Sequence, residues 1–182
     1  MKAKKLRELL NQPGIIRAPG AYDAWSARLV EMAGFPAVYM TGYGVSASVI
    51  GRPDIGLLTM TEMVTQAKNM AAAVDIPLIA DGDNGYGGVL NVVRTVQEYE
   101  RADVAAIQLE DQVFPKRCGH MEGKQLIPQE EMVSKIKAAV YARKSADFVI
   151  IARTDARAVN GFDDAIERAQ AYADAGADVI FF

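Results

Sequence analysis

Short apolar runs alternate along the chain with longer segments in which apolar and polar residues are mixed. Six runs stand out, at residues 15–18, 37–40, 78–80, 104–109, 148–152 and 178–182. None shows the regular apolar–polar alternation of a sheet that has one face in water. Strands of this kind are buried on both faces, which is typical of a parallel sheet covered by helices. The pattern therefore predicts six parallel strands.

Between these runs, apolar residues recur at spacings of three and four, which is the period of one helix face. The clearest helix is predicted to begin at Thr59, because Thr59 and Glu62 have the spacing of a capping box. Its predicted buried face consists of Met63, Ala67, Met70 and Val74. Helices therefore alternate with the predicted strands.

A second helix face is formed by Trp25, Leu29 and Met32, which we expect to pack against the rest of the protein. Residues 41–46 are rich in glycine and are predicted as a loop. Glycines let backbone amides come close to a ligand, and Tyr43 in this loop could hydrogen-bond one. A plain connecting loop is the alternative.

Two architectures fit strands that alternate with helices: a closed eight-stranded barrel and an open, doubly wound sheet. No glycine-rich dinucleotide fingerprint follows the first strand, and polar residues follow several strands rather than one. Both observations favour a (β/α)8 TIM-type barrel. Such a barrel usually takes about 250 residues. We therefore expect residues 1–182 to form a single catalytic barrel domain that carries the first six strands and is truncated on its C-terminal side.

Composition narrows the possible function classes. The chain is 51% hydrophobic and 24% charged, with a net charge of −3. No apolar run approaches the roughly 20 residues of a membrane helix, and no signal-peptide pattern follows Met1, so we expect a cytoplasmic protein that makes no membrane contact. Basic residues are scattered among acidic ones, which argues against nucleic-acid binding. The single cysteine excludes an internal disulfide.

The loop after the fourth run has the densest chemistry in the chain. It contains the only cysteine, Cys118, and the only histidine, His120, close to Lys116 and Arg117. A thiol among positive charges is favoured as the thiolate and can act as a proton donor, acceptor or nucleophile. The alternative is a solvated connector in which the cysteine is incidental.

Acidic residues follow two neighbouring strands. Asp81 and Asp83 come directly after the third run, and Glu110 follows the fourth. An oxygen-rich cluster without added His or Cys suits Mg²⁺, or Mn²⁺, although aspartates two residues apart also occur in plain loops. A metal there could chelate a 2-hydroxy or 2-oxo acid and stabilise the enolate-like charge that develops when the adjacent carbon–carbon bond breaks.

The basic residues have matching candidate roles. Arg153 could hold a second substrate carboxylate; the alternative is a structural salt bridge with Asp155 or Asp111. Cys118 could protonate the departing carbanion, and His120 is the natural partner of its thiol. Lys116 could form a Schiff base, although neutralising substrate charge is the simpler role.

Five motifs together resemble the isocitrate lyase and phosphoenolpyruvate mutase superfamily. They are PGAYD at 19–23, DGDNGYG at 81–87, EDQ at 110–112, PKRCGH at 115–120 and IARTD at 151–155. The resemblance covers essentially the whole chain in order. It implies a (β/α)8 barrel, magnesium, a gating loop that bears the catalytic cysteine, and a homotetramer that exchanges helices between subunits.

Site roles follow from the same resemblance. It implies a metal shell of Asp54, Asp81, Asp83 and Glu110, with Cys118 as the acid. The expected catalytic set is Cys118, Lys116, His120, Arg153 and Tyr43, and the expected substrate-binding set is Tyr43, Gly44, Arg153, Gly119 and His120.

The cysteine favours the carbon–carbon lyase branch, similar to methylisocitrate lyase or 2,3-dimethylmalate lyase. The expected reaction is magnesium-dependent cleavage of a 2-hydroxy di- or tricarboxylate to a 2-oxo acid and a second carboxylic acid. One alternative is a phosphorus–carbon mutase or hydrolase of the carboxyphosphonoenolpyruvate type. The other is an inactive fragment or binding module.

Overall fold

The computed structural model describes residues 1–182 and contains one sheet of six parallel strands. Strands that follow one another in the chain are also neighbours in the sheet. The strands are β1 (Gly20–Ala21), β2 (Val38–Met40), β3 (Leu78–Asp81), β4 (Ala106–Glu110), β5 (Val149–Arg153) and β6 (Val179–Phe181). This order is that of consecutive units in a β/α barrel wall, which confirms the predicted architecture.

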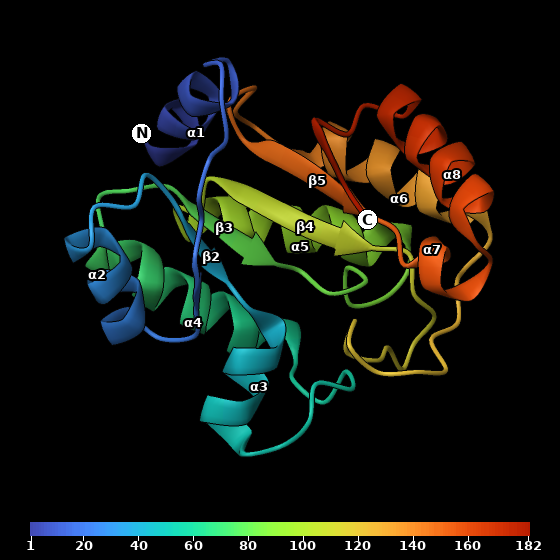
Figure 1. Ribbon diagram of the computed structural model, residues 1–182, viewed down its shortest axis with the longest axis horizontal. Coiled ribbons are helices and arrows are strands. Elements are labelled where there is room, and N and C mark those ends of the chain that lie inside the picture. Colours follow the sequence, from blue (N-terminus) through green and yellow to red (C-terminus); the bar gives the residue numbers. More distant parts are fainter.

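Helices connect the strands and cover the outer side of the curved sheet (Figure 1). They are α1 (Lys2–Leu10), α2 (Ala24–Met32), α3 (Gly42–Ile50), α4 (Met60–Ala73), α5 (Val89–Arg101), α6 (Gln129–Ala142), α7 (Ala156–Val159) and α8 (Phe162–Asp174). Adjacent helices such as α2 and α4, or α5 and α6, pack against one another. None of these helices is both long and apolar enough to cross a membrane.

The start of α4 confirms the predicted capping box. The Thr59 backbone N–H donates to Glu62 Oε2 at 2.8 Å, and the Glu62 N–H donates to Thr59 Oγ1 at 3.4 Å. These bonds satisfy donors that the first turn of a helix leaves without partners. The predicted buried face of α4 is also correct, since Met63, Ala67 and Met70 are fully buried.

Two predictions for the first βα units are wrong. The first strand lies at Gly20–Ala21 and not at 15–18, because Gly20 is the residue that pairs with Tyr39 of β2. Residues 41–46 do not form a loop, because α3 begins at Gly42. Thr41 Oγ1 accepts the Gly44 N–H at 3.2 Å as the N-cap, and Gly51 ends the helix at φ +61°.

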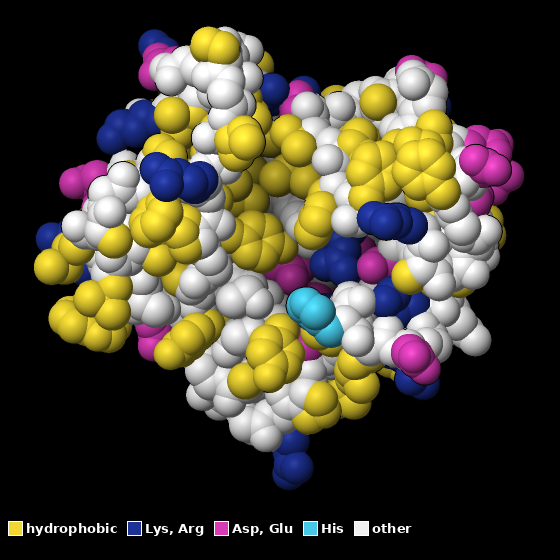
Figure 2. All heavy atoms as spheres, viewed as in Figure 1, with side chains coloured by type: hydrophobic (Ala, Val, Ile, Leu, Met, Phe, Trp, Pro, Cys, Tyr) yellow, Lys and Arg dark blue, Asp and Glu magenta, His cyan; other side chains and the backbone are white.

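The apolar face predicted on α2 is exposed rather than packed. Trp25, Leu29 and Met32 are 68%, 47% and 71% exposed, and the small residue Ala27 is the one that α2 buries. Hydrophobic side chains accordingly gather on the surface over α2 at the left of Figure 2. Periodicity located the helix correctly, but it did not identify which side of the helix meets the sheet.

The amino-terminal ends of the strands are closed by α1. Leu6 is 1% exposed and packs in a separate apolar cluster with Ala105, Ala106, Val149 and Ile151. Polar contacts fasten the same helix: Arg7 Nη2 lies 2.8 Å from Asp178 Oδ1, and Lys2 Nζ lies 3.0 Å from Asp103 Oδ2. The opposite, carboxyl-terminal ends remain open to a cavity.

Candidate active site

A cavity of about 910 Å³ lies at the carboxyl-terminal ends of the strands. Acidic and basic side chains are visible inside this hollow at the centre of Figure 2. In parallel α/β folds this is the end at which ligands bind, because the loops that follow different strands converge there. The sequence predictions placed the candidate site at the same end.

Asp81 ends β3 and is held rigidly. Its Oδ2 accepts the Gly42 N–H at 3.1 Å, and its Oδ1 accepts the Asp83 N–H at 3.0 Å. Position 42 has no room for a side chain, since a Cβ there would lie 2.6 Å from Asp81 Oδ2. The start of α3 and the loop after β3 therefore fix the orientation of this carboxylate.

Lys116 reaches from the cysteine-bearing loop into the group of predicted metal ligands. Its Nζ lies 2.7 Å from both Asp54 Oδ2 and Asp83 Oδ1, and 3.9 Å from Glu110 Oε1. The side chain is 3% exposed. The structure thus brings Asp54, Asp83 and Glu110 around one ammonium group, with Asp81 beside them.

Burial dominates the electrostatics of this group. Burial and the nearby Asp81 charge raise the pKa of Asp83 to about 7, although Lys116 acts in the opposite direction. Burial likewise raises the pKa of Glu110. Burial lowers the pKa of Lys116, but the surrounding carboxylates, Asp83 first, outweigh it and raise that pKa overall. Lys116 is therefore held as the cation.

The donor set fits a hard cation by its chemistry. All four predicted ligands offer carboxylate oxygens, and Asp83 Oδ1 and Glu110 Oε1 are buried without a hydrogen-bond partner, so that the Lys116 ion pairs are their only polar contacts. With Lys116 between them, no three acidic, His or Cys side chains form a ready ligand set. Magnesium keeps several waters, so one direct carboxylate with the others acting through water suffices.

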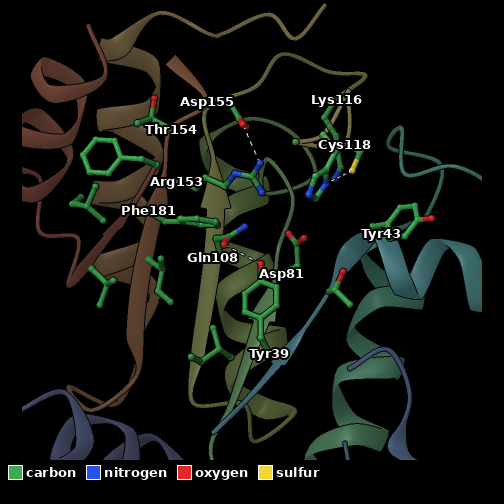
Figure 3. Close-up of a pocket in the computed structure, with 18 of the residues that line it drawn as sticks. Tyr39, Tyr43, Asp81, Gln108, Lys116, Cys118, Arg153, Thr154, Asp155 and Phe181 are labelled. Carbon is green, nitrogen blue, oxygen red and sulfur yellow. Dashed lines mark hydrogen bonds and ion pairs between the residues drawn. The ribbon is translucent and has the colours of Figure 1, made fainter. Parts of the chain in front are cut away.

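Arg153 projects from the end of β5 toward the cavity (Figure 3). Its Nη2 lies 3.0 Å from Asp155 Oδ1, its Nη1 lies 3.8 Å from Glu110 Oε2, and its guanidinium stacks over the Phe181 ring at 5.1 Å. The salt bridge with Asp155 considered from sequence is present, and Asp111 is not its partner. Arg153 lines the cavity, and its Nε is buried without a hydrogen-bond partner.

Cys118 and His120 also line the cavity. Cys118 Sγ lies 3.6 Å from His120 Nδ1, and the cysteine is 8% exposed. The prediction that Lys116 and Arg117 flank the thiol is wrong. Lys116 turns to the carboxylates, and Arg117 Nη1 donates to the Glu122 carbonyl at 3.2 Å. Sequence proximity placed these cations near the thiol, but the fold of the loop directs them elsewhere.

The remaining predicted residues divide into two groups. Tyr43 and Gly119 line the cavity, with Tyr43 at its mouth on α3. Gly44 does not line it, because the first turn of α3 directs this residue toward Tyr22; a Cβ on Gly44 would meet Tyr22 Cβ at 2.8 Å. Gly44 contributes instead to the N-cap of α3.

Two groups of buried polar residues were missed by the sequence analysis. On the cavity floor the Tyr39 hydroxyl donates to Gln108 Oε1 at 2.9 Å, and Gln108 Nε2 has no partner. Beneath the rim, the fully buried Asp111 accepts from the Thr154 and Tyr172 hydroxyls at 2.7 and 2.8 Å. The sequence offered one signal for these two groups, which is a polar residue within an apolar run or on an otherwise apolar helix face.

Comparison with known proteins gives a consistent assignment. The model of the phosphoenolpyruvate phosphomutase family matches residues 6–182. The chain is 59% identical to 2,3-dimethylmalate lyase of Eubacterium barkeri over 98% of its own length and 62% of that protein. It is 49% identical to 2-methylisocitrate lyase of Bacillus subtilis (strain 168) over 98% of its length and 58% of that protein.

A solved structure agrees with both relatives. A phosphonopyruvate hydrolase in complex with oxalate and Mg²⁺ superposes with a TM-score of 0.91 at 40% identity, over 99% of this chain and 62% of that one. The chain thus spans about three-fifths of the length of the proteins it matches. With a family model that matches nearly all of its residues, the chain belongs to the phosphoenolpyruvate phosphomutase family, within the phosphoenolpyruvate mutase and isocitrate lyase superfamily.

Proposed function

We propose that this protein is a magnesium-dependent carbon–carbon lyase. In its reaction a 2-hydroxy di- or tricarboxylate, of the dimethylmalate or methylisocitrate type, yields a 2-oxo acid and a second carboxylic acid. The observation that carries the proposal is the convergence of Cys118 and His120, Arg153 and a group of buried carboxylates on one cavity. The 59% identity to a 2,3-dimethylmalate lyase supports it.

Asp54, Asp81, Asp83 and Glu110 are the residues that would hold the metal. Magnesium supplies positive charge that holds the substrate oxygens and stabilises the oxyanion that develops as the bond breaks. Lys116, already among these carboxylates, offsets their mutual repulsion.

Arg153, whose guanidinium lines the cavity, is assigned to a substrate carboxylate. As the carbon–carbon bond breaks, the hydroxyl proton passes to water in the cavity and the electron pair of the bond passes to the carbon of the departing acid. The Cys118 thiol donates a proton to that carbon, and His120 Nδ1, 3.6 Å from the sulfur, orients the thiol. Tyr43, at the mouth, is assigned to a substrate contact.

The test is 2-oxo acid release from a panel of 2-hydroxy acids, with Mg²⁺ and with a chelator, by this chain and by any longer product of its gene. Cys118→Ser is expected to lower turnover by roughly 10²- to 10⁴-fold, the usual contribution of a general acid. Its unfolding temperature and its affinity for Mg²⁺ should stay unchanged. Undiminished turnover by this variant would refute the role assigned to the thiol.

A second candidate is cleavage of a phosphorus–carbon bond, as in the carboxyphosphonoenolpyruvate and phosphonopyruvate enzymes. The observation in its favour is the 40% identity to a phosphonopyruvate hydrolase with the same fold. Phosphate release from phosphonopyruvate, with no release of 2-oxo acids from hydroxy acids, would select this candidate over the lyase.

A further inference from the structure

Gln112 lies at the base of the cysteine-bearing loop and is 1% exposed. It forms an antiparallel bridge with Leu126, so the two ends of the intervening segment are held together at this point. From this position its side chain reaches forward along the loop. Gln112 Oε1 accepts the Arg117 N–H at 2.9 Å, and Gln112 Nε2 donates to the Arg117 carbonyl at 2.9 Å. The amide thus binds the backbone immediately before Cys118, as a neighbouring strand would.

The same amide also contacts the other side of the cavity. Gln112 Nε2 donates to Asp155 Oδ2 at 2.8 Å, while Asp155 Oδ1 pairs with Arg153 Nη2 at 3.0 Å. Each oxygen of this buried carboxylate therefore has its own partner, one from the loop base and one from β5. Gly119 of the same loop also lies against Arg153, since a Cβ at position 119 would lie 3.3 Å from Arg153 Cζ.

We propose that Gln112 is a positioning residue that sets the location of Cys118 relative to Arg153, through Arg117 on one side and Asp155 on the other. The proposal rests on the proposed function, in which the thiol and the guanidinium act on the same substrate. Because the amide is buried and uses both its donor and its acceptor, replacement by a side chain that lacks either group leaves backbone or carboxylate atoms of the loop base without partners. The loop then opens more often.

The single cysteine makes this movement measurable at one site, because Cys118 is the only thiol in the chain. Cys118 lines the cavity but is only 8% exposed, so we expect alkylation by iodoacetamide, an uncharged reagent, to become faster when the loop opens more often. We expect Gln112→Leu to raise the alkylation rate about tenfold, as expected for the loss of hydrogen bonds of ordinary strength. Gln125→Leu is the matched control, because Gln125 lies in the same loop with an exposed side chain and should leave the rate unchanged.

A double-mutant cycle separates positioning from general loosening of the fold. In Gln112→Glu the new carboxylate still accepts from the Arg117 N–H but faces the Asp155 carboxylate, so alkylation should accelerate. Asp155→Asn should accelerate it as well, because two amide donors then face each other. In the double variant a donor and an acceptor face each other again at residue 155, so the rise should be smaller than the product of the two single effects. The rate should not return fully to the original value, because the Glu carboxylate still cannot donate to the Arg117 carbonyl.

A rise in the double variant equal to the product of the two single effects would overturn the proposal, as would an unchanged rate in both Gln112→Leu and Gln112→Glu. Thermal unfolding of each variant shows whether it is folded at the assay temperature; the Glu variants supply the test if Gln112→Leu is not. The alkylation rate can be measured even if the protein has no enzymatic activity. If the effect in the double variant is smaller than the product of the single effects but no lyase activity is found, the proposed function alone is rejected. If the protein is an active lyase but the single effects simply multiply, the role of Gln112 alone is rejected. In an active protein, kcat should follow the same cycle.

Discussion

The two ends of the parallel strands are closed in opposite ways. At the amino-terminal ends, the buried Leu6 of α1 packs in an apolar cluster, and the ion pairs of Lys2 and Arg7 lie around it with partly exposed side chains. At the carboxyl-terminal ends, Lys116 from a loop lies among Asp54, Asp83 and Glu110, all of them buried. One end gains free energy by removing apolar surface from water, whereas the other is stable only while its charges compensate one another.

This difference indicates that the two ends of the strands have different roles. Apolar packing is insensitive to pH and to ligands, so the apolar cluster around Leu6 stabilises the sheet in every state of the protein. Buried charges that compensate one another respond to any added charge, so the carboxyl-terminal end can change when a substrate or a cation enters. The following predictions test the comparison, beginning with the largest expected effect.

The largest effect is expected from Lys116→Met, which removes the cation and leaves Asp54, Asp83 and Glu110 facing one another. Removal of one partner from a buried ionic group costs about 4 kcal/mol of unfolding free energy. Urea unfolding in the presence of a chelator measures it. Lys124→Met is the control in the same loop; its ammonium bonds only backbone carbonyls, at 2.6 and 3.0 Å, and its loss should cost about 1 kcal/mol. Equal effects of the two variants would contradict the comparison.

Leu6→Ala tests the apolar end. Truncation of a fully buried leucine removes transfer free energy and leaves a cavity, so we expect a loss of about 3 kcal/mol. Leu10→Ala on the same helix, where the side chain is 39% exposed, should change stability by no more than about 0.5 kcal/mol. The alkylation rate of Cys118 in folded Leu6→Ala should match that of the unaltered protein. A faster rate would show that the two ends are coupled.

Thr59→Ala tests a polar feature near the carboxyl-terminal ends that is not buried. The substitution removes the N-cap hydroxyl of α4, and a loss of about 1 kcal/mol is expected from thermal or urea unfolding. An effect as large as that of Lys116→Met would show that burial is not what distinguishes the two sites.

The smallest effect is expected from the pH dependence of the same capping box. Hydrogen bonds from the Thr59 N–H and hydroxyl lower the pKa of Glu62 in the folded state. The stabilisation is therefore present above the pKa of Glu62 in the unfolded chain and is lost as the pH falls through its folded value. Glu62→Gln keeps a capping side chain that does not titrate. The unfolding temperatures of the two proteins should differ near pH 6 and converge toward pH 3; a constant difference would contradict the assignment.

Much of the fold followed from residue patterns that act locally. The run at 78–80 lies in β3, the run at 148–152 overlaps β5 in all but its first residue, and the Thr59–Glu62 spacing located the start of α4. The start of α3 was missed because its glycines favour a loop by propensity, although Thr41 and Gly51 were visible capping signals.

The site was less predictable because the destinations of long side chains are set by the whole fold. Lys116 and Cys118 are two residues apart, yet one points into the carboxylates and the other toward His120. Gln112 was noted only as part of the EDQ motif, and its role was not predicted, because its partner Asp155 lies 43 residues away in sequence. The residue types predicted the chemistry of the cavity, whereas the hydrogen bonds and ion pairs between those residues could be identified only in the structure.

The docking of α1 has a consequence for the order in which the chain folds. The Arg7 side chain bonds the Asp147 carbonyl, 140 residues away in sequence, and also pairs with Asp178. Contacts between residues so distant in sequence close late, because the loop entropy must be lost before they form. During synthesis α1 is made before β5 and the segment that precedes β6, and it has no docking surface until both have left the ribosome. Helix α1 therefore reaches its place only after elements that are made well after it.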